Sequence, residues 1–225
     1  MGIAIPAATM RTAHRFANGD EFLASLGGVA LSRIIWDPWP GTATEADLLH
    51  LVEVEKRLCE LIDGVLLEKP VGVQESLLAG VMMQHLRNWN DAHGDGFVFV
   101  GEAGTLRMAT VDRIRLPDVG AIARSRLPGG KLPRGVAVPA VSPDLVVEVL
   151  SAGNTIGEMS QKRREYFSNG TRVVWQVDPP TRSVAVYTST ADPDATLAGG
   201  DVLDGGDVMP GFSLPLATLF RDLDD

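Results

Sequence analysis

The sequence holds a single cysteine, Cys59, and contains no long apolar run. One cysteine excludes a disulfide framework within the chain and fits a reducing compartment. A membrane-spanning helix needs about 20 consecutive apolar residues, and no run approaches that length. The first ten residues lack the basic region of a secretory signal, and Pro6 interrupts them. We therefore expect a cytoplasmic protein with no membrane association.

Basic residues are scarce as well, and the net charge is −9. This balance disfavours general attraction to nucleic acid, because phosphate groups reward a basic face. One stretch differs: residues 107–134 carry seven Lys and Arg against two Asp, so the stretch is +5 and the remainder −14. Its candidate contacts to nucleic-acid phosphates are Arg113, Arg115, Arg124 and Arg126. A basic face that merely contacts solvent is the alternative interpretation.

The length of 225 residues suits one domain with additions, and 45% hydrophobic residues suffice for a sizeable core. Residues 1–43 are difficult to assign, because prolines and a glycine break the segment 36–41. We predict an N-terminal extension at 1–43 and one main domain at 44–225. No repeat or linker divides the latter.

Regular elements follow from periodicity and from turn signals. Thr44 is a candidate N-cap for a helix reaching about residue 55, and Asp63-Gly64 predicts a hairpin between two apolar runs. Apolar residues at helical spacing predict a helix over 74–92. The other expected elements are strands at 97–100, 105–108, 113–123, 145–150, 172–177 and 183–187, a loop at 124–143, and helices at 156–169 and near 219–220. This order predicts a mixed α/β (α+β) sheet flanked by helices on both faces.

Glu148 is the strongest functional signal. It is one charge in the otherwise apolar run 145–150, which is typical of a strand buried on both faces. A buried carboxylate must be paired, protonated or bound to a metal, because burying it alone costs several kcal/mol. A structural ion pair is the alternative.

Two further residues have similar contexts. Asp118 follows Leu116-Pro117 and precedes an apolar segment, where it is a candidate ligand or a turn cap. Lys162 shares a helix face with apolar neighbours, where it either contacts a site or pairs with Glu158. Asp144, four residues before Glu148, lies on the same strand face or caps the strand entrance.

Together these residues predict phosphodiester chemistry. Two carboxylates can hold Mg²⁺ with waters completing its octahedron. Such an ion activates water and stabilises charge on a phosphoryl group. A nearby lysine can orient the attacking water or neutralise the developing charge.

The motifs resemble one bacterial protein family. They are Leu116-Pro117-Asp118-Val119, Pro143–Ser151 around Glu148, Lys162–Gly170, Val174–Pro179, Glu60–Gly64 and Pro210-Gly211-Phe212. Together they are similar to the Uma-type restriction endonuclease-like proteins, which are placed in the PD-(D/E)XK nuclease superfamily. The resemblance covers roughly residues 44–220. It implies a restriction-endonuclease-like fold, Mg²⁺ or Mn²⁺ as cofactor, and DNA as partner.

The resemblance also implies roles for individual residues. Asp118 and Glu148 would be the acidic metal ligands, and the carbonyl of Val149 the third ligand. The superfamily lysine two residues after the glutamate is replaced by Leu150, and Lys162 would substitute from the following helix. Glu68, or as the alternative Glu75, would supply the additional acidic residue.

Two functions therefore stand at this point. One is a metal-dependent endonuclease that cleaves phosphodiester bonds in DNA with Asp118, Glu148 and Lys162. The other is a catalytically silent nuclease fold that acts as a DNA-binding or protein-interaction module. The missing Glu-x-Lys lysine and the acidic charge favour the second, whereas retention of the three residues together favours the first. A homodimer is left open.

Overall fold

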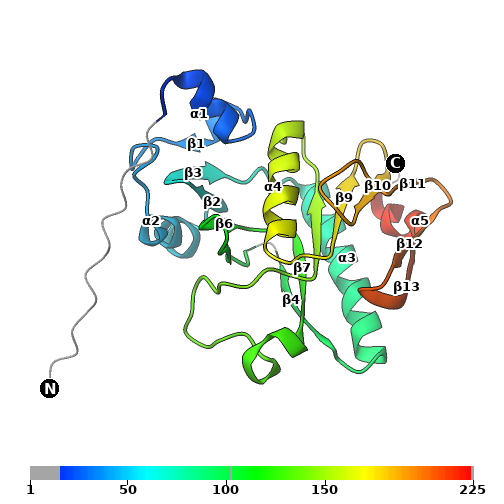
Figure 1. Ribbon diagram of the computed structural model, residues 1–225. Helices are drawn as coiled ribbons and strands as arrows, with labels where there is room; N and C mark the ends of the chain where they lie inside the picture. The colour runs from blue at the N-terminus through cyan, green and yellow to red at the C-terminus, as the bar shows by residue number, and fades with distance from the viewer. Residues whose placement is uncertain (1–15, 102, 224–225) are drawn as a thin grey trace, which may run out of the picture.

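The computed structural model describes residues 16–101 and 103–223 and shows two large sheets side by side (Figure 1). The larger sheet has six strands in the order β11-β10-β9-β8-β7-β4. Its central pair, β8 and β9, is parallel, and the other pairings are antiparallel. The bounds are β4 Phe97–Gly101, β7 Val119–Ala123, β8 Leu145–Val149, β9 Val173–Asp178, β10 Ser183–Tyr187 and β11 Ala195–Ala198. The predicted mixed sheet is confirmed.

The smaller sheet has five strands in the order β1-β3-β2-β6-β5. The predicted hairpin is its centre, since Ile62 pairs with Val65 across the turn at Asp63-Gly64. Both turn residues have positive φ, 50° and 77°, as this tight connection requires. The bounds are β1 Ile34–Ile35, β2 Cys59–Ile62, β3 Val65–Glu68, β5 Leu106–Met108 and β6 Arg113–Arg115.

The predicted extended segment 113–123 is not one strand. It divides into β6, which belongs to the smaller sheet, and β7, which belongs to the larger one. The break lies at Leu116-Pro117-Asp118, where proline has no N–H to continue a ladder. The two sheets therefore meet at Asp118.

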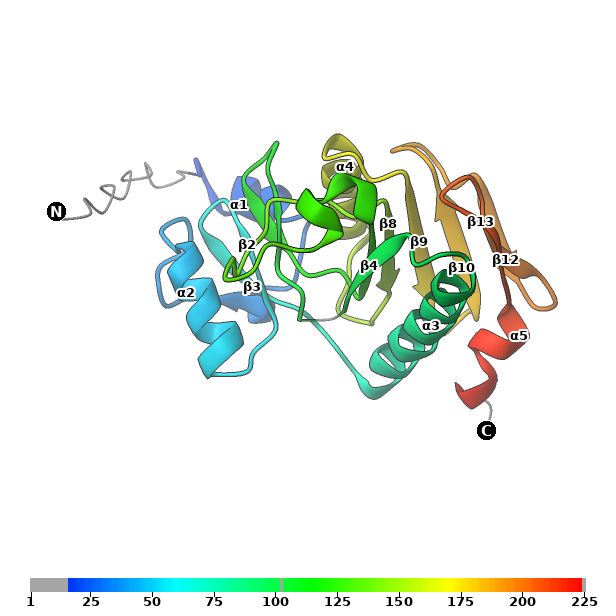
Figure 2. The same cartoon turned by 90° about the horizontal axis from the view of Figure 1, so that it is seen from below.

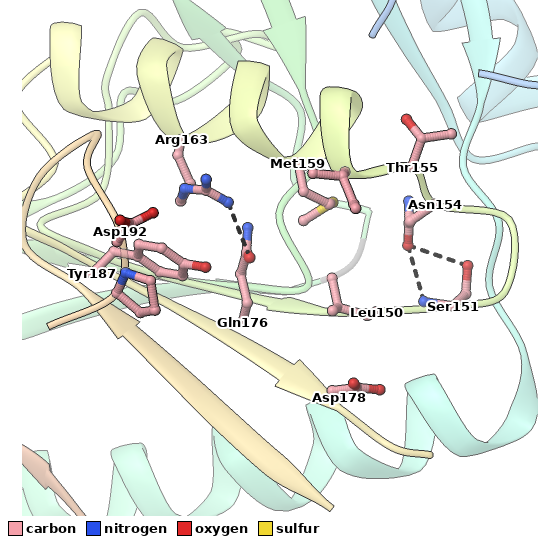
Figure 3. A pocket seen from close by; sticks show the side chains of 12 residues that line it. Leu150, Ser151, Asn154, Thr155, Met159, Arg163, Gln176, Asp178, Tyr187 and Asp192 are labelled. Atoms are coloured by element: carbon pink, nitrogen blue, oxygen red, sulfur yellow. Dashed lines mark hydrogen bonds between the residues drawn. The ribbon is translucent and has the colours of Figure 1, made fainter. Parts of the chain in front are cut away.

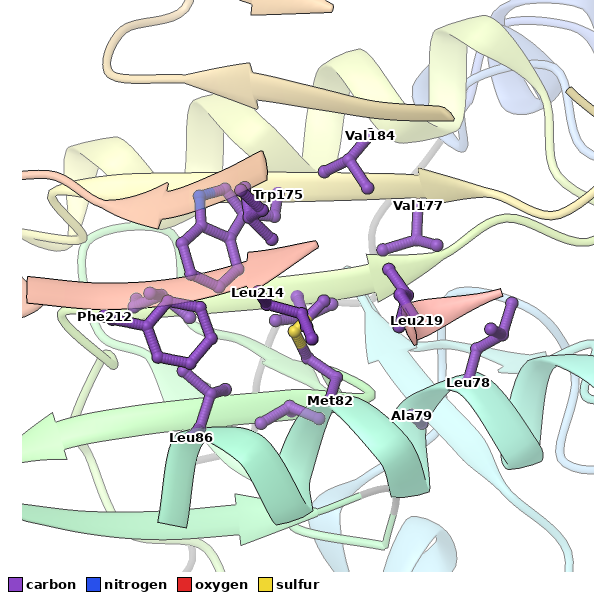
Figure 4. Close-up of a cluster of buried hydrophobic side chains, with 14 of the residues drawn as sticks. Leu78, Ala79, Met82, Leu86, Trp175, Val177, Val184, Phe212, Leu214 and Leu219 are labelled. Atoms are coloured by element: carbon purple, nitrogen blue, oxygen red, sulfur yellow. The ribbon is translucent and has the colours of Figure 1, made fainter. Parts of the chain in front are cut away.

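Two long helices cover opposite faces of the larger sheet: α3, Val73–Ala92, and α4, Ile156–Ser168 (Figure 2). Helix α3 packs Leu78, Met82 and Leu86 against the face formed by alternate residues of β8 and β9. Figure 4 shows this apolar core, in which Trp175 stacks on Phe212 with ring centroids 5.7 Å apart. The α3 face is therefore a mainly apolar core.

The α4 face has a different composition. Val146, Val174 and Tyr166 form a small apolar cluster there, but Glu148 points to the same side and reaches the helix. Helix α4 begins with a capping box between Thr155 and Glu158. The α4 face thus combines apolar packing with buried charge.

Residues 16–43 pack tightly against the rest of the protein. Helix α1, Gly19–Ser25, leads to β1, and Leu26 and Ile34 pack beside Val65 and Leu67 of the smaller sheet. Gly27 lies so close to α4 that a Cβ there would lie 2.4 Å from the backbone nitrogen of Glu158. Residues 1–15 of the predicted extension lie outside the described residues.

The other elements complete the two ends of the molecule. The Thr44 N-cap is confirmed, and α2, Glu45–Leu49, continues as a π-helix over His50–Val54. Residues 124–143 contain two short 3₁₀ turns, Arg124–Arg126 and Pro128–Gly130. At the carboxyl end β12, Val202–Gly205, pairs with β13, Met209–Pro215, before α5, Leu216–Leu219. Among the described residues, no helix is both long and apolar enough to cross a membrane.

Candidate metal and active site

Asp118 and Glu148 lie where the two sheets meet. Asp118 immediately precedes β7, and Glu148 is in β8, whose Val147 pairs with Val119 of β7. The N–H of Val149 donates a 2.7 Å hydrogen bond to Oδ2 of Asp118. Asp118, just before the start of β7, and Glu148, in β8, therefore lie on neighbouring segments of one sheet.

A lysine of the smaller sheet binds Asp118. Lys69 directly follows β3, and its Nζ lies 2.8 Å from Oδ1 of Asp118 and 2.6 Å from the carbonyl oxygen of Leu116. Both side chains are at most 5% exposed. Since a buried carboxylate requires a partner, Lys69 is the ion-pair partner of Asp118.

Helix α4 supplies the partners of Glu148. Lys162 Nζ lies 3.2 Å from Oε2 of Glu148 and 3.0 Å from Oε1 of Glu60 in β2. One turn later the hydroxyl of Tyr166 donates a 2.6 Å hydrogen bond to Oε1 of Glu148. Lys162 thus bridges a carboxylate from each sheet, and Tyr166 orients Glu148.

Arg115 connects this cluster to a second layer of charge. Its guanidinium is fully buried and donates to Glu60 at 2.7 Å and to Glu165 of α4 at 2.6 and 2.9 Å. Glu165 also pairs with Arg113, which in turn contacts Asp63. The result is an ion-pair network that joins β2, β6 and α4.

The pKa values of two carboxyl groups in this cluster shift in opposite directions. Burial raises the pKa of Glu148, and the negative charge of Asp118 adds to the rise, although the Lys162 ammonium opposes it. Burial alone would also raise the pKa of Glu60, but the charges of Lys162 and Arg115 outweigh it and hold that pKa well below its usual range. Glu148 is therefore the carboxylate whose charge is less well compensated.

The residues fit a hard divalent cation such as Mg²⁺ or Mn²⁺. Two carboxylates from adjacent strands are the oxygen donors that Mg²⁺ prefers. A strand residue points its N–H and C=O to the same side, and the N–H of Val149 faces Asp118, so the Val149 carbonyl would be the third donor there. Among residues 16–101 and 103–223, no three His, Cys, Asp or Glu residues cluster as a metal site. The chain would thus supply two acidic ligands and one carbonyl.

Lys69 and Lys162 stand beside these oxygens. An ion bound to Asp118 and Glu148 would compete with both ammonium groups, since like charges cannot share a low-dielectric site at low cost. Metal entry would require Lys69 to move from Asp118. Lys162 would keep Glu60 as a partner, so it can stay in place.

The additional acidic residues predicted from the sequence lie outside this network. Glu68 is 41% exposed and pairs with Arg57. Asp144 is buried, accepts a hydrogen bond from the N–H of Ala123, and pairs with Arg126. The structure brings Glu60, rather than either of these, beside Lys162.

The candidate phosphate-binding arginines all have acidic partners. Arg113 and Arg115 belong to the buried network, whereas Arg124 pairs with Asp95 and Arg126 with Asp144. Arg107 contacts Glu45 and Asp112. Much of the +5 charge of residues 107–134 is therefore compensated by acidic residues outside that stretch.

Sequence reasoning missed Glu60, Lys69 and Tyr166 as parts of the cluster. Glu60 carries the same signal as Glu148, since it is one charge in the apolar run 59–62. Lys69 lies just before Pro70 at the end of a predicted strand, and Tyr166 lies one turn after Lys162 on its helix. A search for lone charges in apolar strands would have found Glu60.

Comparisons with known proteins give the family and the fold. Residues 46–217 match the family model Uma2, whose description is "Putative restriction endonuclease". A solved structure from Anabaena variabilis ATCC 29413, titled as a putative nuclease belonging to DUF820, superposes with a TM-score of 0.64 at 18% identity. The superposition covers 74% of this chain and 91% of that one. No curated protein matches the chain.

Proposed function

The chain belongs to the Uma2 family, and from this premise we propose that it is a metal-dependent endonuclease that hydrolyses phosphodiester bonds in DNA. The observation that carries the proposal is the meeting of Asp118, Glu148 and Lys162 at one junction of the two sheets. Asp118, Glu148 and the Val149 carbonyl would hold Mg²⁺ or Mn²⁺. The bound ion would lower the pKa of a water ligand and stabilise negative charge on the phosphoryl oxygens.

The protein's own groups have separate tasks in this proposal. Tyr166 holds Oε1 of Glu148 by its hydroxyl, and the ion would take Oε2 in place of the contact with Lys162. Lys162, anchored by Glu60, keeps a positive charge where it can orient the attacking water or neutralise the phosphorane. Lys69 balances Asp118 before the ion arrives. Action in the cytoplasm stays a prediction from the single cysteine.

A second candidate is a catalytically silent nuclease fold that binds DNA or another protein. The observation that favours it is burial: Asp118, Glu148 and Lys162 are at most 3% exposed, and every one of them has an internal partner. A phosphodiester must reach these groups for cleavage to occur. The silent fold requires no such opening.

The deciding experiment measures Mn²⁺ binding and cleavage of plasmid DNA with the wild type, Glu148→Gln and Lys162→Met. Glu148→Gln should weaken Mn²⁺ binding and abolish cleavage, because an amide oxygen is a poorer ligand for a hard cation. Lys162→Met should retain Mn²⁺ binding while cleavage slows, because the lysine acts on water or phosphate and not on the ion.

Glu53→Gln is the matched control, since it neutralises an exposed glutamate outside the cluster. The endonuclease proposal fails if the wild type binds no Mn²⁺ in calorimetry and shows no Mn²⁺-induced rise in melting temperature. The silent fold would then stand. Cleavage by the wild type that survives in Glu148→Gln would instead point to a contaminating nuclease.

A further inference from the structure

A pocket of about 430 Å³ opens beside the candidate active site. It lies at the carboxyl ends of β8 and β9, below the first turns of α4, and the segment around Asp192 closes one side (Figure 3). Gln176 in its wall is the direct neighbour of Glu148, because the two residues pair in the β8–β9 register. Paired residues of adjacent strands point to the same face about 5 Å apart. The pocket is therefore one strand away from Glu148.

The inner wall contains polar groups that lack partners. Gln176 is 5% exposed, and its Nε2 has no hydrogen-bond partner among the described residues. The same holds for Nε of Arg163, whose Nη1 donates to Oε1 of Gln176 at 3.1 Å. The Arg163 guanidinium also lies over the ring of Tyr187, 4.2 Å from its centroid, which fixes its plane. A buried donor left without an acceptor costs free energy, so this wall is suited to a ligand that supplies one.

The outer wall carries hydrogen-bond acceptors instead of donors. Asp178 and Asp192 both line the pocket, and Asp192 is exposed. Two carboxylates repel a phosphate group, so the pocket does not suit the phosphodiester backbone. They do suit a ligand with N–H donors. The pocket thus offers a donor on one side and acceptors on the other.

Apolar surface supplies the rest of the lining. Leu150 and Met159 form part of the wall, and Ile156, the first residue of α4, is 91% exposed at the edge. An apolar side chain left this open costs free energy in water and is stabilised when a flat ligand covers it. A planar heterocycle with both donors and acceptors on its edge matches all three features.

We propose that this pocket binds a nucleobase that carries an exocyclic amino group, with cytosine as the probe of that class. The amino group would donate to the carboxylate of Asp192, and a ring carbonyl would accept from Nε2 of Gln176. Thymine presents a carbonyl where cytosine presents its amino group, and a carbonyl facing a carboxylate is repulsive. In the context of the proposed nuclease function, on which this part rests, the base belongs to an unpaired nucleotide next to the cleaved bond.

The test is a metal-free titration of the full chain with dCMP and with dTMP, followed by ¹H–¹⁵N correlation spectra. We expect dCMP to bind roughly tenfold more tightly than dTMP, the discrimination of about one hydrogen bond. The shifted amides should be those of residues 150–156 and 176–178. Asp192→Asn should remove most of the preference, because the new amide can donate to the thymine carbonyl. Gln176→Leu should weaken both nucleotides alike, since both present a ring carbonyl.

Asp91→Asn and Arg164→Met are the matched controls, because both are exposed and neither lines the pocket. Asp192 is exposed as well, so its variant is expected to fold, and it keeps the test decisive even if Gln176→Leu unfolds. Equal affinity for dCMP and dTMP in the wild type would overturn the assignment of an amino-bearing base. Absence of saturable binding would overturn the proposal that this pocket binds a nucleobase. An unchanged affinity for both nucleotides in Asp192→Asn would overturn it as well.

These outcomes are separate from those of the nuclease proposal. Because no metal is present, dCMP binding that persists in Glu148→Gln supports the pocket whether or not the chain cleaves DNA. Mn²⁺-dependent cleavage without dCMP binding would leave the nuclease proposal intact and end this one.

Discussion

The two faces of strand β8 differ although they are built from alternate residues of the same five-residue segment. Leu145, Val147 and Val149 face α3 and belong to the large apolar core. Val146 and Glu148 face α4, where Glu148 meets a lysine and a tyrosine hydroxyl. Both faces are buried. Burial alone therefore does not distinguish scaffold from site, whereas the chemistry of what is buried does.

The comparison also shows how the protein tolerates buried charge. On the α4 side each carboxylate has at least one cation within 3.2 Å, and Arg115 and Lys162 each serve two carboxylates. Removing one member leaves an uncompensated buried charge, which costs more than the pair contributes. The apolar side chains on the α3 face have no such dependence on charged partners. The stability lost by substituting one of them should therefore follow the side-chain volume removed.

The largest effect is expected for Arg115→Met, which fills similar volume without charge. It leaves the buried carboxylates of Glu60 and Glu165 without their shared partner, so we expect unfolding free energy to fall by about 5 kcal/mol. Chemical denaturation at pH 7 measures this. Arg124→Met is the control, because its pair with Asp95 is exposed and should matter by less than about 1 kcal/mol. A loss at Arg115 no larger than at Arg124 would contradict the network.

On the apolar face, Trp175→Ala should cost about 4 kcal/mol, because it removes the largest buried side chain and leaves a cavity beside Phe212. Trp39→Ala, at a residue 68% exposed, should have a small effect. If the two faces act separately, Trp175→Ala should leave any Mn²⁺-induced rise in melting temperature unchanged. A loss of that rise would show that the apolar core also positions the site.

A pH-dependent effect is expected where residues 16–43 meet α4. Burial alone would raise the pKa of Glu158, but its hydrogen bonds with Arg33 outweigh this, so the pKa lies below its usual value. The stabilisation is then present above the unfolded-state pKa of about 4.3 and disappears as pH falls through the lower folded value. Arg33→Met should lower the free energy of unfolding by about 2 kcal/mol at pH 7. The variant should also lose less stability than the wild type as pH falls below ~4.3. Denaturation from pH 3 to 7 measures both effects.

Arg57→Met is the control for this comparison, because Arg57 is 39% exposed where it pairs with Glu68. Identical pH profiles for the wild type and Arg33→Met would contradict the assignment. The same measurement bears on the predicted boundary at residue 43, which stays a prediction. A strong dependence on Arg33 would favour treating residues 16–43 as part of the main domain.

The smallest effect is expected for Glu148→Gln without metal. Its raised pKa means that ionised Glu148 opposes folding: its favourable contribution is complete below the unfolded-state pKa and is lost as pH rises through the folded value. The amide removes that cost while Lys162 keeps Glu60, so the net change should stay within about 1 kcal/mol at pH 7. Relative to wild type, the variant should gain stability as pH rises. Glu60→Gln provides the contrast, because it removes the carboxylate that pairs with both Lys162 and Arg115. It should therefore lower the free energy of unfolding by more than Glu148→Gln does.

Local patterns predicted much of the fold. The helix predicted over 74–92, the Asp63-Gly64 hairpin, the Thr44 cap and the buried strand around Glu148 are all confirmed. They follow from interactions within a few residues, which composition and spacing record. The prediction of a single strand over 113–123 was wrong, because the two halves of this segment join different sheets. No periodicity records which sheet a strand enters.

The sequence by itself determined that Asp118, Glu148 and Lys162 are unusual, because each is a polar group among apolar neighbours and must be compensated. Tertiary structure alone decided which groups compensate them. It brought Lys69 to Asp118 across 49 residues and Arg115 to Glu60 across 55. It also placed Arg107, Arg113, Arg115, Arg124 and Arg126 of the basic stretch in ion pairs within the chain. The physical reason is that the cost of burying a charge is local to its residue, whereas its partner can come from any element that packing brings within about 4 Å.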